Sequence, residues 1–260
     1  MDSITKARIN LFAVLRNLED LCDLDLESKE IIKDSNIGIE FHVPEVGRAI
    51  LEFRKGKCKF TRVIDGKKQG AKAALQLFFT SPEHFNKLID GEKTVPIFFN
   101  IFAVGFLLKQ FTKLTDRMVH FLQPKPEEKE ELLKDEVYFK INTTLTAYTA
   151  FFAMAEIANS DFIGRAIARR MPDCSLQCGV EDGFKLTVDV KNHEMAVRKG
   201  GTDKWYAEMI FADLQFAHDL LNGNTSSFTG MGTGKFKVRG AVEILEQMAK
   251  LLSQVGIYLA

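Results

Sequence analysis

The chain has 260 residues, enough for one or two domains with a buried core. Hydrophobic residues make up 46% and charged residues 27%, which is typical of soluble globular proteins and excludes wholesale disorder, a collagen-like chain and a small disulfide scaffold. Basic and acidic residues number 35 each, and this zero net charge argues against a non-specific nucleic-acid binder.

The first half of the chain predicts a long helix followed by a group of strands. Apolar spacing indicates a helix over about residues 4–33, with Asp23-Leu24-Asp25 as the place where it would break. A second helix is predicted from the N-cap Ser81 to Gly91, and a last strand, at about 98–102, precedes a closing helix. Alternation of apolar and polar residues predicts the other strands at about 38–44, 48–54, 57–64 and 74–79.

Two prolines and a charge run mark a boundary near the middle of the chain. Gln123-Pro124-Lys125-Pro126 is followed by five residues of which four are acidic, which is typical of a linker leading into an acidic helix start. We therefore predict one domain over residues 1–123, a linker over 124–131 and a second domain over 132–260.

The second half of the chain repeats the order of the first. A long helix is predicted over 132–170, and another begins at the N-cap Asp213 and ends at Gly223. The final helix follows a short strand at 235–238. Further strands are predicted at about 176–181, 184–190, 193–198 and 205–211. The apolar face of the final helix is made by Val242, Leu245, Met248, Ala249, Leu252 and Val255.

The two halves align as copies of one fold. Residues 39–60 align without gaps to 176–197, at an offset of 137. The offset is 132 from Leu75 to Gly91 and returns to 137 afterwards, so that Phe99 aligns with Phe236. Insertions that fall in loops while the apolar register is kept are expected of two copies of one domain.

Four short motifs of the second copy occur in the order and spacing of a known family. They are Gly183–Val190, Ala207–Asp213, Phe216–Gly223 and Gly234–Gly240. Over about 172–260 the chain thereby resembles the sterol carrier protein 2 domain. The resemblance implies an α/β fold of the α+β type: two repeated domains, each a five-stranded mixed sheet covered by helices around an apolar cavity. It also implies binding and transfer of lipid or fatty-acyl ligands without covalent chemistry.

The first copy is a more distant relative of the same pattern. The last motif of the second copy, Gly234–Gly240, has the pattern Gly-Lys-strand-Gly. The corresponding segment of the first copy is Pro96–Gly105, which is more apolar. This departure puts a shared ligand preference in doubt, so we expect the second copy to be the ligand site.

Phenylalanine and methionine are the residues that we expect to line such a cavity, because both adapt to varied apolar ligands. The chain has 22 Phe against four Tyr and one Trp. The same side chains could instead fill an ordinary core. The candidates in the second copy are Trp205, Met209, Phe211, Phe216, Leu220, Phe228, Met231, Phe236, Leu245, Met248 and Leu252. Their counterparts in the first copy include Leu75, Leu77, Phe79, Phe85, Leu88, Phe99, Ile101, Phe106, Leu108 and Phe111.

A basic stretch runs from Arg48 to Lys72 in the first copy only. It has nine basic residues against Glu52 and Asp65, whereas five basic residues face four acids over 185–208 in the second copy. One interpretation is contact with an anionic membrane surface or with the phosphates of an acyl-CoA; the other is the solvated face of a hairpin. Its basic residues are Arg48, Arg54, Lys55, Lys57, Lys59, Arg62, Lys67, Lys68 and Lys72.

No catalytic or metal-binding pattern emerges from the sequence. The five histidines do not cluster, Cys174 and Cys178 lack partners at zinc-ligand spacing, and the glycines of 230–234 are followed by a strand pattern rather than by a phosphate-binding helix. We expect 224–234 to be a flexible loop that gates the cavity mouth. No catalytic residue, metal or cofactor is therefore predicted.

The sequence leaves two classes of function open. The first is a non-enzymatic lipid-binding protein of the cytoplasm. We expect that compartment because the cysteines are scattered, as is typical of unpaired thiols, and because the sequence shows neither a signal-peptide pattern nor an apolar stretch long enough to span a bilayer. The second is an interaction or accessory protein with filled interiors that docks to an enzyme of acyl-CoA or lipid metabolism. Neither reading involves nucleic acid, and the sequence does not give the oligomeric state.

Overall fold

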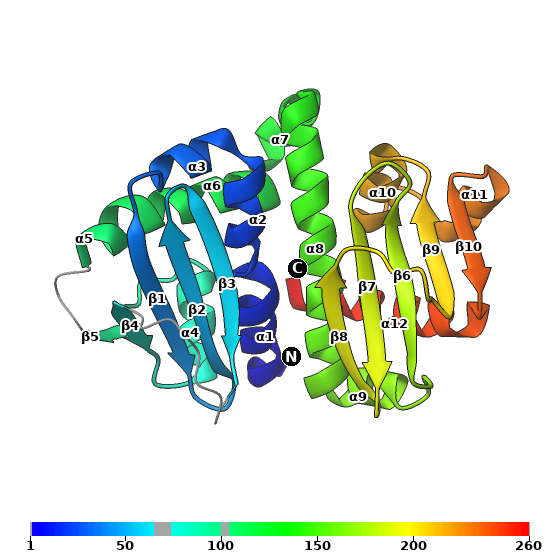
Figure 1. Ribbon diagram of the computed structural model, residues 1–260, viewed down its shortest axis with the longest axis horizontal. Coiled ribbons are helices and arrows are strands. Elements are labelled where there is room, and N and C mark those ends of the chain that lie inside the picture. Colours follow the sequence, from blue (N-terminus) through cyan, green and yellow to red (C-terminus); the bar gives the residue numbers. More distant parts are fainter. Residues whose placement is uncertain (1, 65–73, 100–103, 260) are drawn as a thin grey trace. The chain divides into compact units, whose positions relative to one another are not determined.

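The protein is described here from a computed structural model that covers residues 2–64, 74–99 and 104–259. The chain divides into two compact units, unit 1 (Met1–Leu145) and unit 2 (Thr146–Ala260). Each unit holds one five-stranded mixed sheet with helices (Figure 1), so the predicted α/β class and the duplication of the sheet are confirmed.

Unit 1 opens with several short helical segments where one long helix was predicted. They are α1 (Ser3–Ile9), a π-helical segment η1 (Asn10–Val14), α2 (Asn17–Leu24) and α3 (Leu26–Ile31). The carboxylate of Asp2 caps α1 by accepting a hydrogen bond from the backbone N–H of Thr5. The predicted break is confirmed at Asp25, which has extended backbone angles and caps α3 through the N–H of Ser28.

The sheet of unit 1 has the strand order β3-β2-β1-β4-β5. β1 pairs with β4 in parallel, and the other neighbours are antiparallel. The strands are β1 (Asn36–Val43), β2 (Gly47–Arg54), β3 (Lys57–Val63), β4 (Leu75–Phe78) and β5 (Ile97–Phe99).

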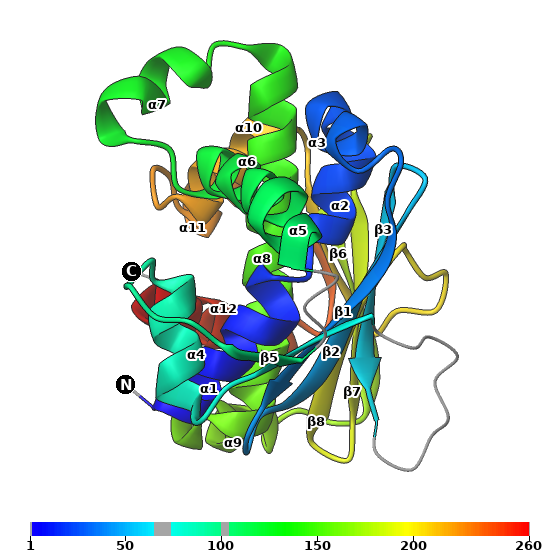
Figure 2. The same ribbon diagram turned by 90° about the vertical axis from the view of Figure 1, so that its left-hand side faces the viewer.

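Helices cover one face of this sheet, and Figure 2 shows α1 and α4 on that side. The predicted cap Ser81 accepts a hydrogen bond from the N–H of His84, and Gly91 follows the helix with a φ of 78°. After β4 the helices of unit 1 are α4 (Pro82–Ile89), α5 (Val104–Phe106), η3 (Leu107–Phe111) and α6 (Thr112–Leu122).

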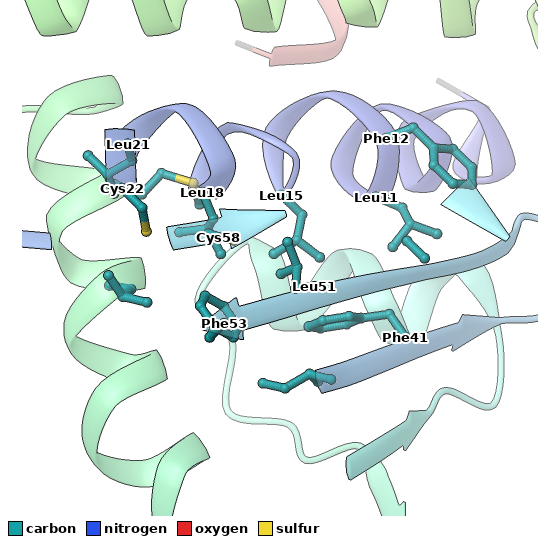
Figure 3. Packing of buried hydrophobic residues seen from close by; sticks show 14 of the residues in the cluster. Leu11, Phe12, Leu15, Leu18, Leu21, Cys22, Phe41, Leu51, Phe53 and Cys58 are labelled. Atoms are coloured by element: carbon teal, nitrogen blue, oxygen red, sulfur yellow. The ribbon is translucent and has the colours of Figure 1, made fainter. Parts of the chain in front are cut away.

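The core of unit 1 lies between the opening helices and the inner face of the sheet (Figure 3). Leu11, Leu15 and Leu18 point from the helices toward Phe41 and Phe53 on the strands. Phe53 also contacts the rings of two helical phenylalanines, at centroid distances of 5.1 and 6.3 Å. This interior is closely filled by aromatic and leucine side chains.

After α6 the chain continues through α7 (Pro126–Leu132), α8 (Glu136–Ser160) and α9 (Phe162–Ala168) before the first strand of the second sheet. The helix predicted over 132–170 is therefore interrupted. Asp161 has extended backbone angles, and its carboxylate caps α9 by accepting a hydrogen bond from the N–H of Gly164. α7 begins within the predicted linker, α8 starts in unit 1 and ends in unit 2, and the domain boundaries at 123 and 132 stay predictions.

The sheet of unit 2 has the order β10-β9-β6-β7-β8, which is the order of unit 1 read from the other edge. Its strands are β6 (Cys174–Val180), β7 (Lys185–Lys191), β8 (Glu194–Lys199), β9 (Ala207–Phe211) and β10 (Phe236–Gly240). Its remaining helices are α10 (Leu214–Leu221), α11 (Ser227–Gly232) and α12 (Val242–Leu259). α12 runs behind the sheet in Figure 1 and packs against β9 and α9.

The strand registers of the two sheets coincide at the offsets found in the sequence. Ile39 pairs with Leu51 and with Leu75, and 137 residues later Leu176 pairs with Val188 and with Ala207. Four strands of each sheet are thus equivalent residue by residue, which makes a position-by-position comparison of the two units meaningful.

The fifth strand departs from the sequence alignment. Phe236 lies opposite Phe211, whereas Phe99 lies opposite Gln76, whose counterpart Glu208 faces Arg239. The alignment of Phe99 with Phe236 is therefore wrong by three residues. The cause is that the loops before β5 and β10 differ in length, so apolar content alone did not fix the register.

Candidate functional site

The predicted lining residues of unit 2 fall into three groups by exposure. Most lie in the interior, on β9, β10, α10 and α12. The buried ones are Met209, Phe211, Phe216, Phe236, Leu245 and Met248. The half-buried ones are Trp205, Leu220 and Leu252. The exposed ones are Phe228 and Met231.

Alternation along β9 directs Met209 and Phe211 to the inner face of the sheet. Met209 lies between Cys178 on β6 and Val238 on β10, and Phe211 lies between Val180 and Phe236. The inner face near β9 is therefore apolar on three adjacent strands, as the sequence predicted.

Three phenylalanine rings meet at the β9–β10 end of this face. Phe211 and Phe236 stack at a centroid distance of 5.3 Å and an interplanar angle of 16°. Phe216 lies 6.3 Å from each of the other two rings. We call Phe211, Phe216 and Phe236 the phenylalanine trio, whose rings lie within the contact distance of aromatic pairs.

The helix α11 packs on Phe216 and Phe236 of the trio at Gly230. Ser226 begins α11 by accepting a hydrogen bond from the N–H of Thr229, and Gly230 is buried. A Cβ atom placed on Gly230 would lie 2.1 Å from Cζ of Phe216 and 2.8 Å from Cβ of Phe236. Only a residue without a side chain fits this contact, and sequence analysis missed that role of Gly230.

The prediction for residues 224–234 needs correction. This segment contains a capped helix where a loop was expected, because the Ser226 side chain supplies an N-cap that the glycine content concealed. Phe228 is 80% exposed and Met231 is 43% exposed. Neither lies inside the unit in this conformation, so the two residues do not line its interior.

The polar groups around the buried His218 in unit 2 bond to one another and to the backbone. The Asn222 side-chain amide donates a hydrogen bond to the backbone carbonyl of His218, which lies at the end of α10. Burial raises the pKa of the Cys178 thiol well above its ordinary value, which keeps the thiol protonated and unreactive at neutral pH. Among the described residues, no group of three or more His, Cys, Asp or Glu is placed to hold a metal ion.

The outer face of the second sheet carries paired charges. Arg239 lies 3.1 Å from Glu208, which also accepts a hydrogen bond from Gln177 at 2.9 Å. Lys237 makes an ion pair of 2.8 Å with Glu181. Charges on this face of β10 are thus balanced by acidic neighbours.

The equivalent positions of the first sheet are apolar. Because of the register of β5, Ile97 and Phe99 take the places of Lys237 and Arg239. Ile97 is 51% and Phe99 60% exposed, and Phe99 contacts the ring of Phe78 at 5.4 Å. Phe99, predicted to be part of a cavity lining, instead lies at the sheet edge.

The other predicted lining positions of unit 1 are mostly interior, with one further exception. Leu108 is exposed, because it lies on the outer side of η3. Ile101 falls outside the described residues. The buried positions are Leu75, Leu77, Phe79 and Phe85. The half-buried positions are Leu88, Phe106 and Phe111.

In the described part of the basic stretch of unit 1, two arginines make ion pairs. Arg48 pairs with Glu40 at 3.2 Å and Arg54 with Glu52 at 3.1 Å. The guanidinium of Arg62 lies 3.8 Å from the centroid of the Phe12 ring. Lys55, Lys57 and Lys59 are exposed, while Lys67, Lys68 and Lys72 fall outside the described residues.

A hollow of about 770 Å³ opens beside this stretch, at the β2–β3 turn of unit 1. Four of its seven lining residues are basic. The apolar cavity predicted for unit 2 stays a prediction. None of the helices in the described ranges combines the length and hydrophobicity that crossing a bilayer requires.

Comparison with known proteins gives weak structural likenesses only. No protein-family model matches the chain, and no curated protein sequence matches it. A solved structure described as UbiJ-SCP2 ubiquinone synthesis protein is 12% identical, with a TM-score of 0.35, over 43% of this chain and 96% of the other.

Two more solved structures have similar values. The sterol carrier protein domain 2 of Helicoverpa armigera is 15% identical, with a TM-score of 0.35, over 42% of this chain and 87% of its own. Sterol carrier protein 2 from Yarrowia lipolytica, in its apo form, is 18% identical, with a TM-score of 0.33, over 42% of this chain and 91% of its own. Each of these three matches covers less than half of this chain, and membership of the family stays a prediction.

Proposed function

We propose that the chain binds lipid or fatty-acyl ligands without covalent chemistry, between the inner face of the second sheet and the helices α10, α11 and α12. In this proposal it needs no cofactor, and it acts in the cytoplasm as a carrier that can transfer its ligand. The observation that supports the proposal most is the apolar interior of unit 2, in which Met209, Met248 and the phenylalanine trio are all buried.

Ligand binding would draw its free energy from burial of an alkyl chain. Each methylene transferred from water contributes about 0.8 kcal/mol before the cost of association is subtracted. Because Gly230 of α11 packs closely on Phe216 and Phe236, a chain that enters beside the trio would displace α11 or turn one of these rings. α11 suits this movement, since it has six residues and only Gly230 among them is buried.

A matched pair of variants on β9 tests the proposal. Met209 faces the interior and its neighbour Ile210 the outer side, so Met209→Trp is expected to abolish displacement of a fluorescent fatty acid while Ile210→Trp preserves it. Circular dichroism checks that both variants are folded. If Met209→Trp unfolds, native mass spectrometry of the wild-type protein is used instead: a retained lipid supports the proposal, and its absence counts against it.

The second candidate function is that of an interaction or accessory protein whose interiors are already filled. Two observations favour it: the close contact of Gly230 with the trio, and the exposed side chains of Ile97 and Phe99 on β5. Purified protein that retains no lipid and does not displace the fluorescent fatty acid would reject ligand binding in favour of this function.

A further inference from the structure

The hollow in unit 1 lies where the β2–β3 turn meets the segment between α3 and β1. Four of the side chains around it are basic and one is acidic. The lining residues are Lys33, Asp34, Ser35, Asn36, Arg54, Lys55 and Lys57. We call the four basic residues Lys33, Arg54, Lys55 and Lys57 the basic corner.

The backbone of this corner is held in place from two sides. Lys55 and Gly56 have φ angles of 49° and 78°, the conformation of a tight hairpin turn. The N–H of Lys55 donates to the carbonyl of Ser35 at 3.1 Å, and the N–H of Gly56 donates to the carbonyl of Ile32 at 3.2 Å. The turn that presents the lysines is therefore attached to the α3–β1 segment, and the site is built on a fixed backbone.

The basic corner has more positive charge than its neighbours balance. Lys33 makes an ion pair with Glu30, and Arg54 makes one with Glu52. Within the described residues neither Lys55 nor Lys57 makes an ion pair. Among the residues that the structure describes, these two lysines therefore lie at the hollow without an ion-pair partner, and Asp34 is the one acidic residue in its lining.

Unit 2 shows that the fold does not require these charges. The positions equivalent to Asn36, Lys55 and Lys57 hold Asp173, Asn192 and Glu194. In unit 2 the carboxylate of Asp173 accepts a hydrogen bond of 2.8 Å from the N–H of Asn192. The same hairpin is therefore made with acidic residues in one unit and with lysines in the other.

Protection of a sheet edge does not account for the lysines either. β3 and β8 are both edge strands, and charged side chains on such strands discourage pairing with other chains. β8 achieves this with Glu194 and Arg198, so either sign of charge serves. In unit 1 four basic side chains and one acidic side chain line a hollow at this turn.

We propose that the basic corner is a binding site for a phosphate monoester. By the rule for phosphorylated side chains, a monoester carries between one and a half and two negative charges at neutral pH. This charge matches that of Lys55 and Lys57, which make no ion pair with the described part of the chain. Arg54 can add a charge-assisted hydrogen bond to a phosphate oxygen. This site is separate from the lipid-binding proposal for unit 2, and it narrows the broader expectation of contact between residues 48–72 and anionic membranes.

The full-length protein can be tested with inorganic phosphate and with vesicles. Phosphatidylcholine vesicles containing phosphatidic acid, a monoester, are compared with vesicles that contain phosphatidylglycerol, a diester. Wild-type protein is expected to bind the phosphatidic acid vesicles more tightly than the phosphatidylglycerol vesicles. The double variant Lys55→Glu with Lys57→Glu is expected to bind the phosphatidic acid vesicles about tenfold more weakly than the wild type. This difference between variant and wild type should fall as salt is added. Binding of inorganic phosphate in calorimetry would indicate a soluble ester, and binding to vesicles alone a lipid headgroup.

The control has the same change in net charge in unit 2, where Lys204 and Lys235 are exposed. Lys204→Glu with Lys235→Glu is expected to leave both kinds of binding unchanged. The proposal is overturned if the Lys55 and Lys57 variant binds as the wild type does, or if the control variant loses as much. Fatty-acid displacement measured on the same samples reports on unit 2 separately, so the failure of one proposal is distinguishable from the failure of the other.

Discussion

The contact of α11 with the phenylalanine trio gives a sharp prediction. In Gly230→Ala the new Cβ would lie 2.1 Å from Cζ of Phe216, and no rotamer change of alanine can relieve this contact. Overpacking of this kind lowers the free energy of unfolding by about 1–3 kcal/mol. The higher helix propensity of alanine offsets up to about 1 kcal/mol of this loss. We expect a net loss of about 1–2 kcal/mol in the free energy of unfolding of unit 2.

The control variant lies two residues away in the same helix. A Cβ on Gly232 would have no atom within 4 Å, so Gly232→Ala tests helix propensity alone. We expect it to leave stability unchanged or to raise it by less than about 1 kcal/mol. Urea unfolding followed by circular dichroism measures both variants. Equal midpoints for the two would refute the close packing of α11 on the trio.

The same pair of variants connects packing to function. If α11 must move before a ligand enters, Gly230→Ala lifts it from Phe216 and Phe236 and should speed association of a fluorescent fatty acid. Gly232→Ala should leave that rate unchanged. Slower association in Gly230→Ala would mean that α11 helps to form the binding site rather than to cover it.

Three further predictions concern single interactions. Burial works to raise the pKa of Asp25, but hydrogen bonds and charge from Arg117 hold it below its ordinary value, so Asp25→Asn should cost about 1–2 kcal/mol at neutral pH. The wild-type carboxylate loses this stabilisation as the pH falls through its lowered pKa. The difference in unfolding free energy between the wild type and Asp25→Asn, measured with urea, should therefore shrink below about pH 4. A difference that stays constant with pH would contradict the ion pair. Tyr258→Phe removes a hydrogen bond of 2.8 Å to the Asp161 carboxylate and should lower stability by about 1 kcal/mol; an unchanged melting temperature would contradict it. Cys178 should resist thiol reagents in native protein and react once urea unfolds unit 2; labelling at equal rates in both states would refute its burial.

Local patterns were sufficient to predict most of the elements. Ser81 and Asp213 were identified as caps from the sequence, and each accepts a hydrogen bond from the N–H three residues later. Gly91 and Gly223 end the helices that follow, with φ angles of 78° and 75°. These signals lie within a few residues of the structure that they specify, so they survive without knowledge of the fold.

The errors arose where a structure depends on contacts that are distant in the sequence. The glycines of 230–234 resemble a loop, and only the position of α11 over Phe216 and Phe236 explains why Gly230 is buried. Exposure of Phe228 likewise depends on which side of α11 meets the sheet. Residue type could therefore nominate an apolar set for the site, but it could not separate the lining residues from those on the surface.

The fifth strand shows why a count of phenylalanines does not identify a cavity. Shifting its register by three residues moves a side chain to the opposite face of the sheet, because side chains alternate along a strand. Phe236 thereby lies inside unit 2, whereas Phe99 is on the outer face of the first sheet, where the second sheet has Arg239. A phenylalanine excess in the sequence thus combines two different features, a filled interior and an exposed apolar edge. The exposed edge, at Ile97 and Phe99, belongs to unit 1, while the filled interior with the candidate lipid site belongs to unit 2.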